Sequence, residues 1–210
     1  MSQLLLQVQY PIGNFKTISV GLNIDSFEPE VHIGRADIFG VTLNLQEWNS
    51  FVSQITQPEV TSYELGPNYQ IVIRNVLGEK LVMIEKNDRK PKHCVYFNVQ
   101  QWKQFKTLLL CIKHAVFRCA GASVILREYV QSVVSDVMKR VRQMCCACCG
   151  LTSTHTCTNE HIIRENICYP EIIDSYKDID MRRIQLEVQC FCTENLVLQV
   201  RNHLYNNMWF

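Results

Sequence analysis

The chain has 210 residues, 47% of them hydrophobic and 20% charged, and a formal net charge of +1. These totals are typical of a globular protein with one large or two small domains. Since no run of about 18 uninterrupted apolar residues occurs, we expect neither a membrane span nor a membrane partner.

Charged residues are distributed unevenly along the chain. Residues 1–73 hold two basic and seven acidic side chains, whereas residues 74–118 hold ten basic and three acidic ones. Residues 119–210 are balanced, with nine basic and ten acidic side chains. A surface that attracts anions is therefore expected on the segment 74–118.

The first elements expected along the chain are strands followed by a helix. Residues 1–13 contain a short apolar run without the basic start and small-residue cleavage site of a signal peptide, so we interpret them as a strand. Further strand candidates are 15–24, 29–38 and 41–45. A helix is expected at 46–55 because its apolar residues share one face. These residues are Trp48, Phe51, Val52 and Ile55.

The next elements repeat this order. Strands are expected at 69–76, 80–86 and 93–99, separated by a turn at 77–79 and a charged loop at 87–92. A helix follows, in which apolar residues recur at spacings of three and four. They are Trp102, Phe105, Leu109, Ile112 and Val116, while Lys103, Lys106 and Lys113 lie off this stripe.

One segment occurs twice. Residues 41–52 read VTLNLQEWNSFV, and residues 95–106, 54 positions later, read VYFNVQQWKQFK. The shared Trp48 and Trp102 could stack on nucleic-acid bases or pack in a core. Because both lie on an apolar helical stripe, we interpret them as core residues.

The order of features in 63–116, and less closely in 15–57, resembles the C-terminal domain of the transcriptional coactivator positive cofactor four. The resemblance implies a strongly curved four-stranded antiparallel sheet with one helix, which works as a symmetric dimer and binds single-stranded or melted DNA. The matching positions are Leu65-Gly66, Arg74-Asn75, Gly78, Lys86 and Gln101-Trp102.

The repeat and the resemblance together predict an α+β fold. It would consist of two tandem curved antiparallel sheet-plus-helix units, at 1–60 and 61–118, that form an intramolecular pseudo-dimer. Pairing is expected because a unit of about 50 residues buries too little surface to be secure alone. A helical and Cys-rich C-terminal region would follow at 119–210.

The resemblance also implies which residues contact DNA, with basic side chains on phosphates and rings on bases. Arg74 keeps the basic residue that ends a strand, but Val76 replaces the aromatic residue of the following turn, and Leu77 and Glu79 replace the turn lysines. The tyrosines could instead face the core, and the basic run could be only a solvated loop. The predicted nucleic-acid-binding residues are Arg74, Lys80, Lys86, Arg89, Lys90, Lys92, Tyr69 and Tyr96.

Beyond Gly121, residues 122–144 are expected to form a second helix, whose valine stripe would serve homo-oligomerisation or packing between domains. The segment IQLEVQCFC, from Ile184, alternates strictly and predicts a strand. Residues 193–195 could be a turn into a further strand, LVLQV, or the cap of a short helix, and we favour the hairpin. The stripe consists of Val130, Val133, Val134, Val137 and Val141.

Eleven cysteines are many for this chain, and eight lie in 145–192. The odd count and the adjacent pairs favour a reducing compartment over a disulfide framework, so we expect the protein in the nucleus or cytoplasm. Two overlapping C-x2-C pairs predict a structural Zn2+ site, although some thiols could instead be small buried side chains. The candidate ligands are Cys145, Cys146, Cys148, Cys149, His155, Cys157 and His161.

Common catalytic motifs are missing from the sequence, which has no P-loop, G-x-S-x-G, H-E-x-x-H or glycine-rich dinucleotide fingerprint. We therefore expect a non-enzymatic protein that binds nucleic acid, in particular single-stranded DNA, and acts with transcription or replication proteins. The alternative is a structural or adaptor protein, of viral or mobile-element origin, that oligomerises and uses the fold without binding DNA.

Overall fold

The computed structural model describes residues 4–35, 40–55, 62–87, 94–149, 160–168 and 181–206. The chain divides into two compact units, Met1–Gly121 and Ala122–Phe210. In the described part of the chain, all strands lie in the first unit. The expected α+β class is confirmed, with two four-stranded antiparallel sheets and a long helix.

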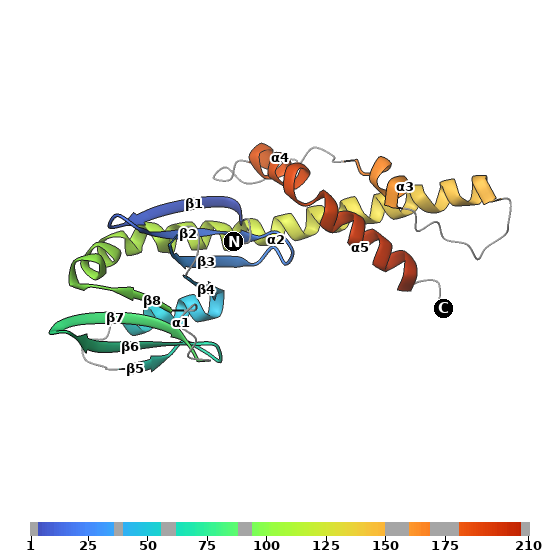
Figure 1. Ribbon diagram of the computed structural model, residues 1–210. Helices are drawn as coiled ribbons and strands as arrows, with labels where there is room; N and C mark the ends of the chain where they lie inside the picture. Colours follow the sequence, from blue (N-terminus) through green and yellow to red (C-terminus); the bar gives the residue numbers. More distant parts are fainter. Residues whose placement is uncertain are drawn as a thin grey trace. The chain divides into compact units, whose positions relative to one another are not determined.

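The first sheet has the order β1-β2-β3-β4 (Figure 1). Its strands are β1 (Leu4–Ile12), β2 (Lys16–Asn23), β3 (Pro29–Gly34) and β4 (Gly40–Asn44). The chain then enters helix α1 (Leu45–Ile55). The strand predicted at the N-terminus is therefore confirmed as β1, which pairs antiparallel with β2.

The second sheet repeats this order as β5-β6-β7-β8. It contains β5 (Ser62–Glu64), β6 (Tyr69–Val76), β7 (Glu79–Lys86) and β8 (Cys94–Phe97). The predicted strand 69–76 is confirmed at both ends, and β7 begins one residue before its predicted start. The three-residue β5 was not separately predicted, because so short a strand carries no readable alternation.

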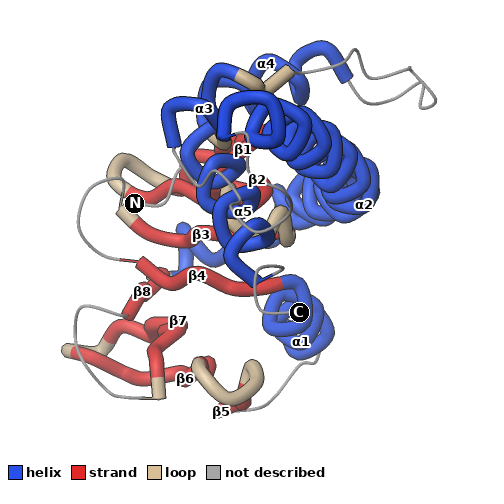
Figure 2. Tube along the Cα trace, turned by 90° about the vertical axis from the view of Figure 1, so that its right-hand side faces the viewer, coloured by secondary structure: helices blue, strands red, loops and turns tan. Residues whose placement is uncertain are grey.

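The two sheets meet at their last strands, β4 and β8. The strands follow one another in space in the order β1-β2-β3-β4-β8-β7-β6-β5, with α1 and the start of helix α2 on one side of both sheets (Figure 2). The second helix, α2, spans Val99–Cys149. Each half of the first unit thus ends its sheet beside the other half and continues into a helix.

Aromatic rings from both halves form one cluster in the core. The ring centroids of Phe51 in α1 and Phe105 in α2 lie 5.5 Å apart, and those of Phe51 and Trp102 lie 6.2 Å apart. Trp48 is 2% exposed, and the ring of Phe97 lies 5.8 Å from that of Phe105. The interpretation of Trp48 as a core residue is confirmed, and Trp102, which is half-buried, packs against the same cluster with its ring 5.2 Å from that of Phe105.

Helix α2 is uninterrupted, so the expected separation into two helices at Gly121 is wrong. A glycine inside a helix costs only about 1 kcal/mol relative to alanine, and the buried stripe continues on both sides of it, at Val116 and Leu126. By length and composition alone, Val99–Gln143 could cross a membrane, a test that core helices of soluble proteins also pass.

The second unit contains the end of α2 and helices α3 (Glu160–Glu165), α4 (Met181–Phe191) and α5 (Thr193–Asn206). The predicted strand from Ile184 and the hairpin after it are therefore wrong, and residue 193 starts a helix. The cause is that Ile184, Val188 and Cys192 recur every four residues and are at most 2% exposed, whereas Leu186 between them is 53% exposed. Within the alternating apolar residues of this segment, every second one belongs to the buried face of a helix.

The valine stripe of α2 is buried within the single chain. Its five members, Val130, Val133, Val134, Val137 and Val141, are at most 5% exposed. They therefore pack inside the molecule, and a homo-oligomer stays a prediction that requires another surface. On the outside of this unit, Arg164 in α3 forms an ion pair with Glu194 in α5.

Candidate nucleic-acid interface

The register of the second sheet separates its two faces. Ile71, Ile84 and Val95 lie side by side across β6, β7 and β8, and all three are buried. Because successive side chains of a strand alternate between the faces, the neighbouring positions form the outward face. At its centre Val72 lies opposite Met83, which lies opposite Tyr96.

Arg74 lies on this outward face, but its charge is already paired. Its guanidinium lies 3.0 Å from a carboxylate oxygen of Glu85, and the amide of Gln70 donates a hydrogen bond to the same carboxylate at 2.9 Å. The side chain of Arg74 is 52% exposed and that of Glu85 is 12% exposed. Glu64 and Glu79 share this face, so its described charged residues are one basic and three acidic.

The structure does not bring Lys80 and Lys86 together with Arg74. In the register of β6 and β7, Lys80 lies opposite Asn75 and Lys86 opposite Tyr69, whereas Arg74 lies opposite Leu81. Both lysines therefore alternate to the other face, at the two ends of the hairpin. Lys80 is exposed and Lys86 is half-buried.

The other three predicted basic residues lie outside the described part of the chain. They are Arg89, Lys90 and Lys92, which follow β7 and precede β8 in the sequence. Their role in binding DNA stays a prediction from the sequence.

The two predicted stacking tyrosines contact the other half of the first unit. The backbone N–H of Thr42 in β4 donates a hydrogen bond to the Tyr69 hydroxyl at 3.4 Å. The Lys16 ammonium lies 4.4 Å from the centroid of the Tyr96 ring. Tyr96 nevertheless keeps 53% of its surface exposed, so its ring can still meet a ligand.

Both helices start with the same pair of hydrogen bonds. At α1, the Glu47 backbone N–H donates to Asn44 Oδ1 at 2.9 Å and the Asn44 N–H donates to Glu47 Oε2 at 3.0 Å. At α2, Gln101 and Asn98 form the equivalent bonds, at 2.8 and 3.3 Å. These reciprocal bonds form a capping box, which fixes where each strand turns into its helix.

The third residue of each helix, Glu47 in α1 and Gln101 in α2, also reaches the first hairpin turn of the other half. Glu47 Oε1 accepts a hydrogen bond from the Asn68 amide at 2.9 Å, and Gln101 Oε1 accepts one from the Lys16 ammonium at 2.9 Å. A glycine with positive φ, Gly66 or Gly13, lies against each of these side chains. Gly13 has a φ of 62°, which glycine adopts without strain, and a Cβ there would also approach Gln101 Nε2 to 3.1 Å, so both the backbone and the contact favour glycine.

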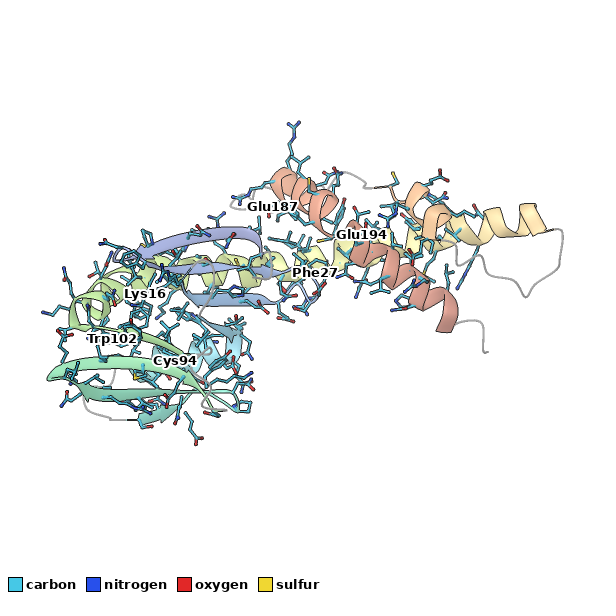
Figure 3. All side chains as sticks on the ribbon, in the orientation of Figure 1. Lys16, Phe27, Cys94, Trp102, Glu187 and Glu194 are labelled. Carbon is cyan, nitrogen blue, oxygen red and sulfur yellow. The ribbon has the colours of Figure 1, made fainter. Side chains whose placement is uncertain are left out.

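Three described ionisable groups in this unit, Tyr10, Lys16 and Cys94, have pKa values shifted mainly by burial, and the pKa of Tyr10 is raised. The pKa of Lys16 is lowered because burial disfavours its charged form. The pKa of the Cys94 thiol is raised by burial first and by the nearby Glu85 carboxylate second. Lys16 and Cys94 are labelled in Figure 3.

The sequence interpretation left out the largest group of exposed basic residues that the structure describes in the first unit. Lys103, Lys106 and Lys113, together with Arg118, are exposed on α2. The signal was present in the sequence, which contains no acidic residue between Asp88 and Glu128. Because the resemblance implied binding by the sheet, the predicted site did not include the helix.

The predicted zinc ligands lie where the structure describes no side chains. Cys145, Cys146, Cys148 and Cys149 lie in the last turn and a half of α2, where members of each C-x2-C pair share a side of the helix. His155 and Cys157 lie outside the described residues, and of His161 only the backbone is described. Among the side chains that are described, no group of three or more metal-binding residues occurs.

Comparison with known proteins adds no family to this arrangement. No protein-family model, curated protein or solved structure matches the chain. The resemblance to positive cofactor four therefore stays a prediction.

Proposed function

We propose that the first unit is an intramolecular pseudo-dimer and that the protein binds single-stranded or melted DNA without catalysing a reaction. The observation that carries the pseudo-dimer is the pair of crossed contacts, Glu47 with Asn68 and Gln101 with Lys16. Glu47 and Gln101 are 54 positions apart, the same spacing as the repeated segment. Crossed contacts at equivalent positions are what an isologous dimer interface provides when both copies lie in one chain.

The charge distribution supports a nucleic acid as the partner. Ten of the basic residues lie in 74–118 with three acidic ones, and the described lysines of α2 in this segment are exposed. Lysine and arginine gain affinity for a phosphate backbone by releasing counterions. Exposed rings such as that of Tyr96 stack on bases without regard to sequence. We propose that the protein acts where strands are separated, in transcription or replication.

A fluorescence-anisotropy titration tests this function. The purified full chain is titrated into labelled single-stranded and duplex oligonucleotides of about 20 nucleotides over a salt series. We expect tighter binding to the single strand and a logarithmic salt slope of about −0.7 for each phosphate contact. Absence of binding at low salt would overturn the proposal.

A structural or adaptor role is the second candidate, and the paired charge of Arg74 favours it. The Arg74–Glu85 ion pair and the excess of carboxylates on the outward face of β5–β8 make that face a poor match for phosphates. Light scattering distinguishes the two roles, because a stable multimer without affinity for nucleic acid is expected only of an adaptor.

We also propose a structural Zn2+ held by cysteines at the end of α2 and by downstream residues. The i, i+3 spacing of each C-x2-C pair on a helix allows two thiolates to reach one tetrahedral ion. Metal analysis of the purified protein is expected to find zinc, and chelation is expected to lower the helix content of the second unit. A protein purified without metal that keeps its full helix content would contradict this.

A further inference from the structure

The solvent face of α2 in the first unit carries a run of exposed basic and apolar side chains. The basic residues are Lys103, Lys106, Lys113 and Arg118. Among them lie Leu110 and Phe117, each 77% exposed. Gly121 lies about one turn beyond these residues, and the space beside it is open, since a Cβ there would meet nothing outside the helix backbone within 4 Å. We call the stretch 103–118 the basic face of α2.

Helical geometry places these residues on one side. At 100° per residue, Leu110 and Phe117 lie within about 40° of Lys103 around the axis, and Lys106 and Lys113 lie about 60° and 80° to one side. The buried Phe105 and Ile112 lie on the opposite side. The basic face is therefore about 22 Å long, with apolar side chains along its middle and lysines along its edge.

Three lysines of this face have no carboxylate partner among the described residues. Lys103, Lys106 and Lys113 form no ion pair with any described residue, whereas Arg74 on the sheet is paired with Glu85. The helix itself has no acidic residue before Glu128. Lysines without an internal ion pair are available to an external anion, because no ion pair has to be broken first.

We propose that the basic face of α2, rather than the outward face of β5–β8, holds the backbone of a bound single-stranded nucleic acid. Lys103, Lys106 and Lys113 contact successive phosphates, and the Phe117 ring provides a surface on which a base stacks. This inference rests on the proposed function and locates its binding surface.

Charge decides between this occupant and a second copy of the chain. Two copies pairing through the same face would bring their lysines together, and like charges in contact are destabilising. A polyanion removes that repulsion. The exposed Phe117 and Leu110 can contact the apolar faces of nucleobases. A role in binding phosphates alone would not account for these exposed apolar side chains.

The test compares two sets of three charge removals in the full chain. The helix variant carries Lys103→Gln, Lys106→Gln and Lys113→Gln, and the matched sheet variant carries Arg74→Gln, Lys80→Gln and Lys86→Gln. Binding to the labelled single strand is measured over the salt series, after circular dichroism has shown that both variants keep the helix content of the wild type. The helix variant is expected to reduce the magnitude of the salt slope by about 2, as three lost phosphate contacts require. The sheet variant is expected to change it by less than half as much.

Two outcomes overturn the inference in different ways. If the wild-type protein binds and only the sheet variant changes the slope, the binding surface is the sheet, and the proposed function still stands. If the wild-type protein does not bind any oligonucleotide at low salt, both the function and this inference fail. A loss of the native fold in the helix variant is resolved by the single changes Lys106→Gln and Lys113→Gln, each of which should lower the slope by about 0.7.

A second variant tests the role of the aromatic ring. Phe117→Ala is expected to weaken binding by about fivefold or more and to leave the salt slope unchanged, because stacking releases no counterions. Phe117→Trp is expected to restore the affinity. Unchanged DNA binding by Phe117→Ala, together with loss of binding to vesicles that contain phosphatidylserine, would identify the face as a lipid surface and contradict the proposal.

Discussion

The two halves of the first unit share their interiors and differ at their surfaces. In both, an asparagine caps the helix, and the third helical residue reaches the hairpin turn of the other half. At that crossing the first half uses a carboxylate against an amide, and the second uses an amide against an ammonium. The comparison shows which positions the fold constrains: those at the crossings and in the shared core keep their geometry, whereas charge and loop length vary.

The loops between the second and third strands show the same contrast. In the first sheet, Asn23 Oδ1 accepts hydrogen bonds from the backbone N–H groups of Asp25 and Ser26, at 2.8 and 3.0 Å. In the second sheet the connection is the two-residue turn Leu77-Gly78, between the paired Val76 and Glu79. The Asn23 side chain thus supports the first loop, whereas the second is a tight turn in which Leu77 and Gly78 both have positive φ.

The largest expected effect concerns the core that the two halves share. Phe51→Ala and Phe105→Ala should each lower the free energy of unfolding by about 3–5 kcal/mol. Because the two rings are in contact, the double variant should lose less than the sum of the two. Urea unfolding followed by tryptophan fluorescence measures all three, with the exposed Phe15→Ala as a control. Additive losses would mean that the two halves have independent cores.

Exchanging glutamate and glutamine at the third helical residue should affect stability differently in the two halves. Glu47 accepts hydrogen bonds on both carboxylate oxygens, so Glu47→Gln turns one acceptor into a donor and should cost about 1–3 kcal/mol. Gln101→Glu places a carboxylate beside the Lys16 ammonium and should not destabilise. Urea unfolding measures both, and Gln101→Glu in a Lys16→Met background should lose this tolerance. Equal effects of the two exchanges would show that the crossings are equivalent.

A smaller effect is expected in the second hairpin. Leu77 has a φ of 51° and is fully exposed, so its branched side chain tolerates the left-handed conformation poorly and packs against nothing that compensates. Leu77→Asn should raise the free energy of unfolding by roughly 0.5–1 kcal/mol, since asparagine followed by glycine is the preferred two-residue turn. Leu77→Ala keeps the conformational penalty and should give no such gain. Thermal unfolding of the three proteins measures the difference.

The smallest effect on stability concerns Cys94, at the start of β8. Its pKa in the folded protein is raised above the ordinary 9.0, so the stability it contributes is fully present below pH 9 and is lost as the pH rises through the folded pKa. Its thiol should be alkylated more slowly at pH 8–9 than that of the exposed Cys111. Mass spectrometry of timed iodoacetamide reactions measures both rates. Glu85→Gln should accelerate the reaction of Cys94, and no acceleration would show that burial alone sets its pKa.

The sequence by itself determined the local elements of the first unit. The β-branched residues of 69–76, among them Ile71, Val72 and Ile73, were enough to predict β6, because such side chains favour the extended backbone of a strand. The repeated Asn-x-x-Glu and Asn-x-x-Gln mark both helix starts, since a capping box is formed by residues three apart. The excess of basic residues in 74–118 was also evident in the sequence, but the resemblance led to the prediction that the sheet carries the binding site.

Tertiary structure decided what local pattern left open. The segment from Ile184 alternates and also repeats every four residues, and only the burial of Val188 and Cys192 with Leu186 left exposed selects the helix. Likewise, only the fold shows that Glu85 pairs with Arg74, whereas Lys103, Lys106 and Lys113 form no ion pair with a described residue. Ion pairs and burial depend on residues distant in sequence, so the chain's pattern predicted where elements form, and packing decided which surfaces remain available to a partner.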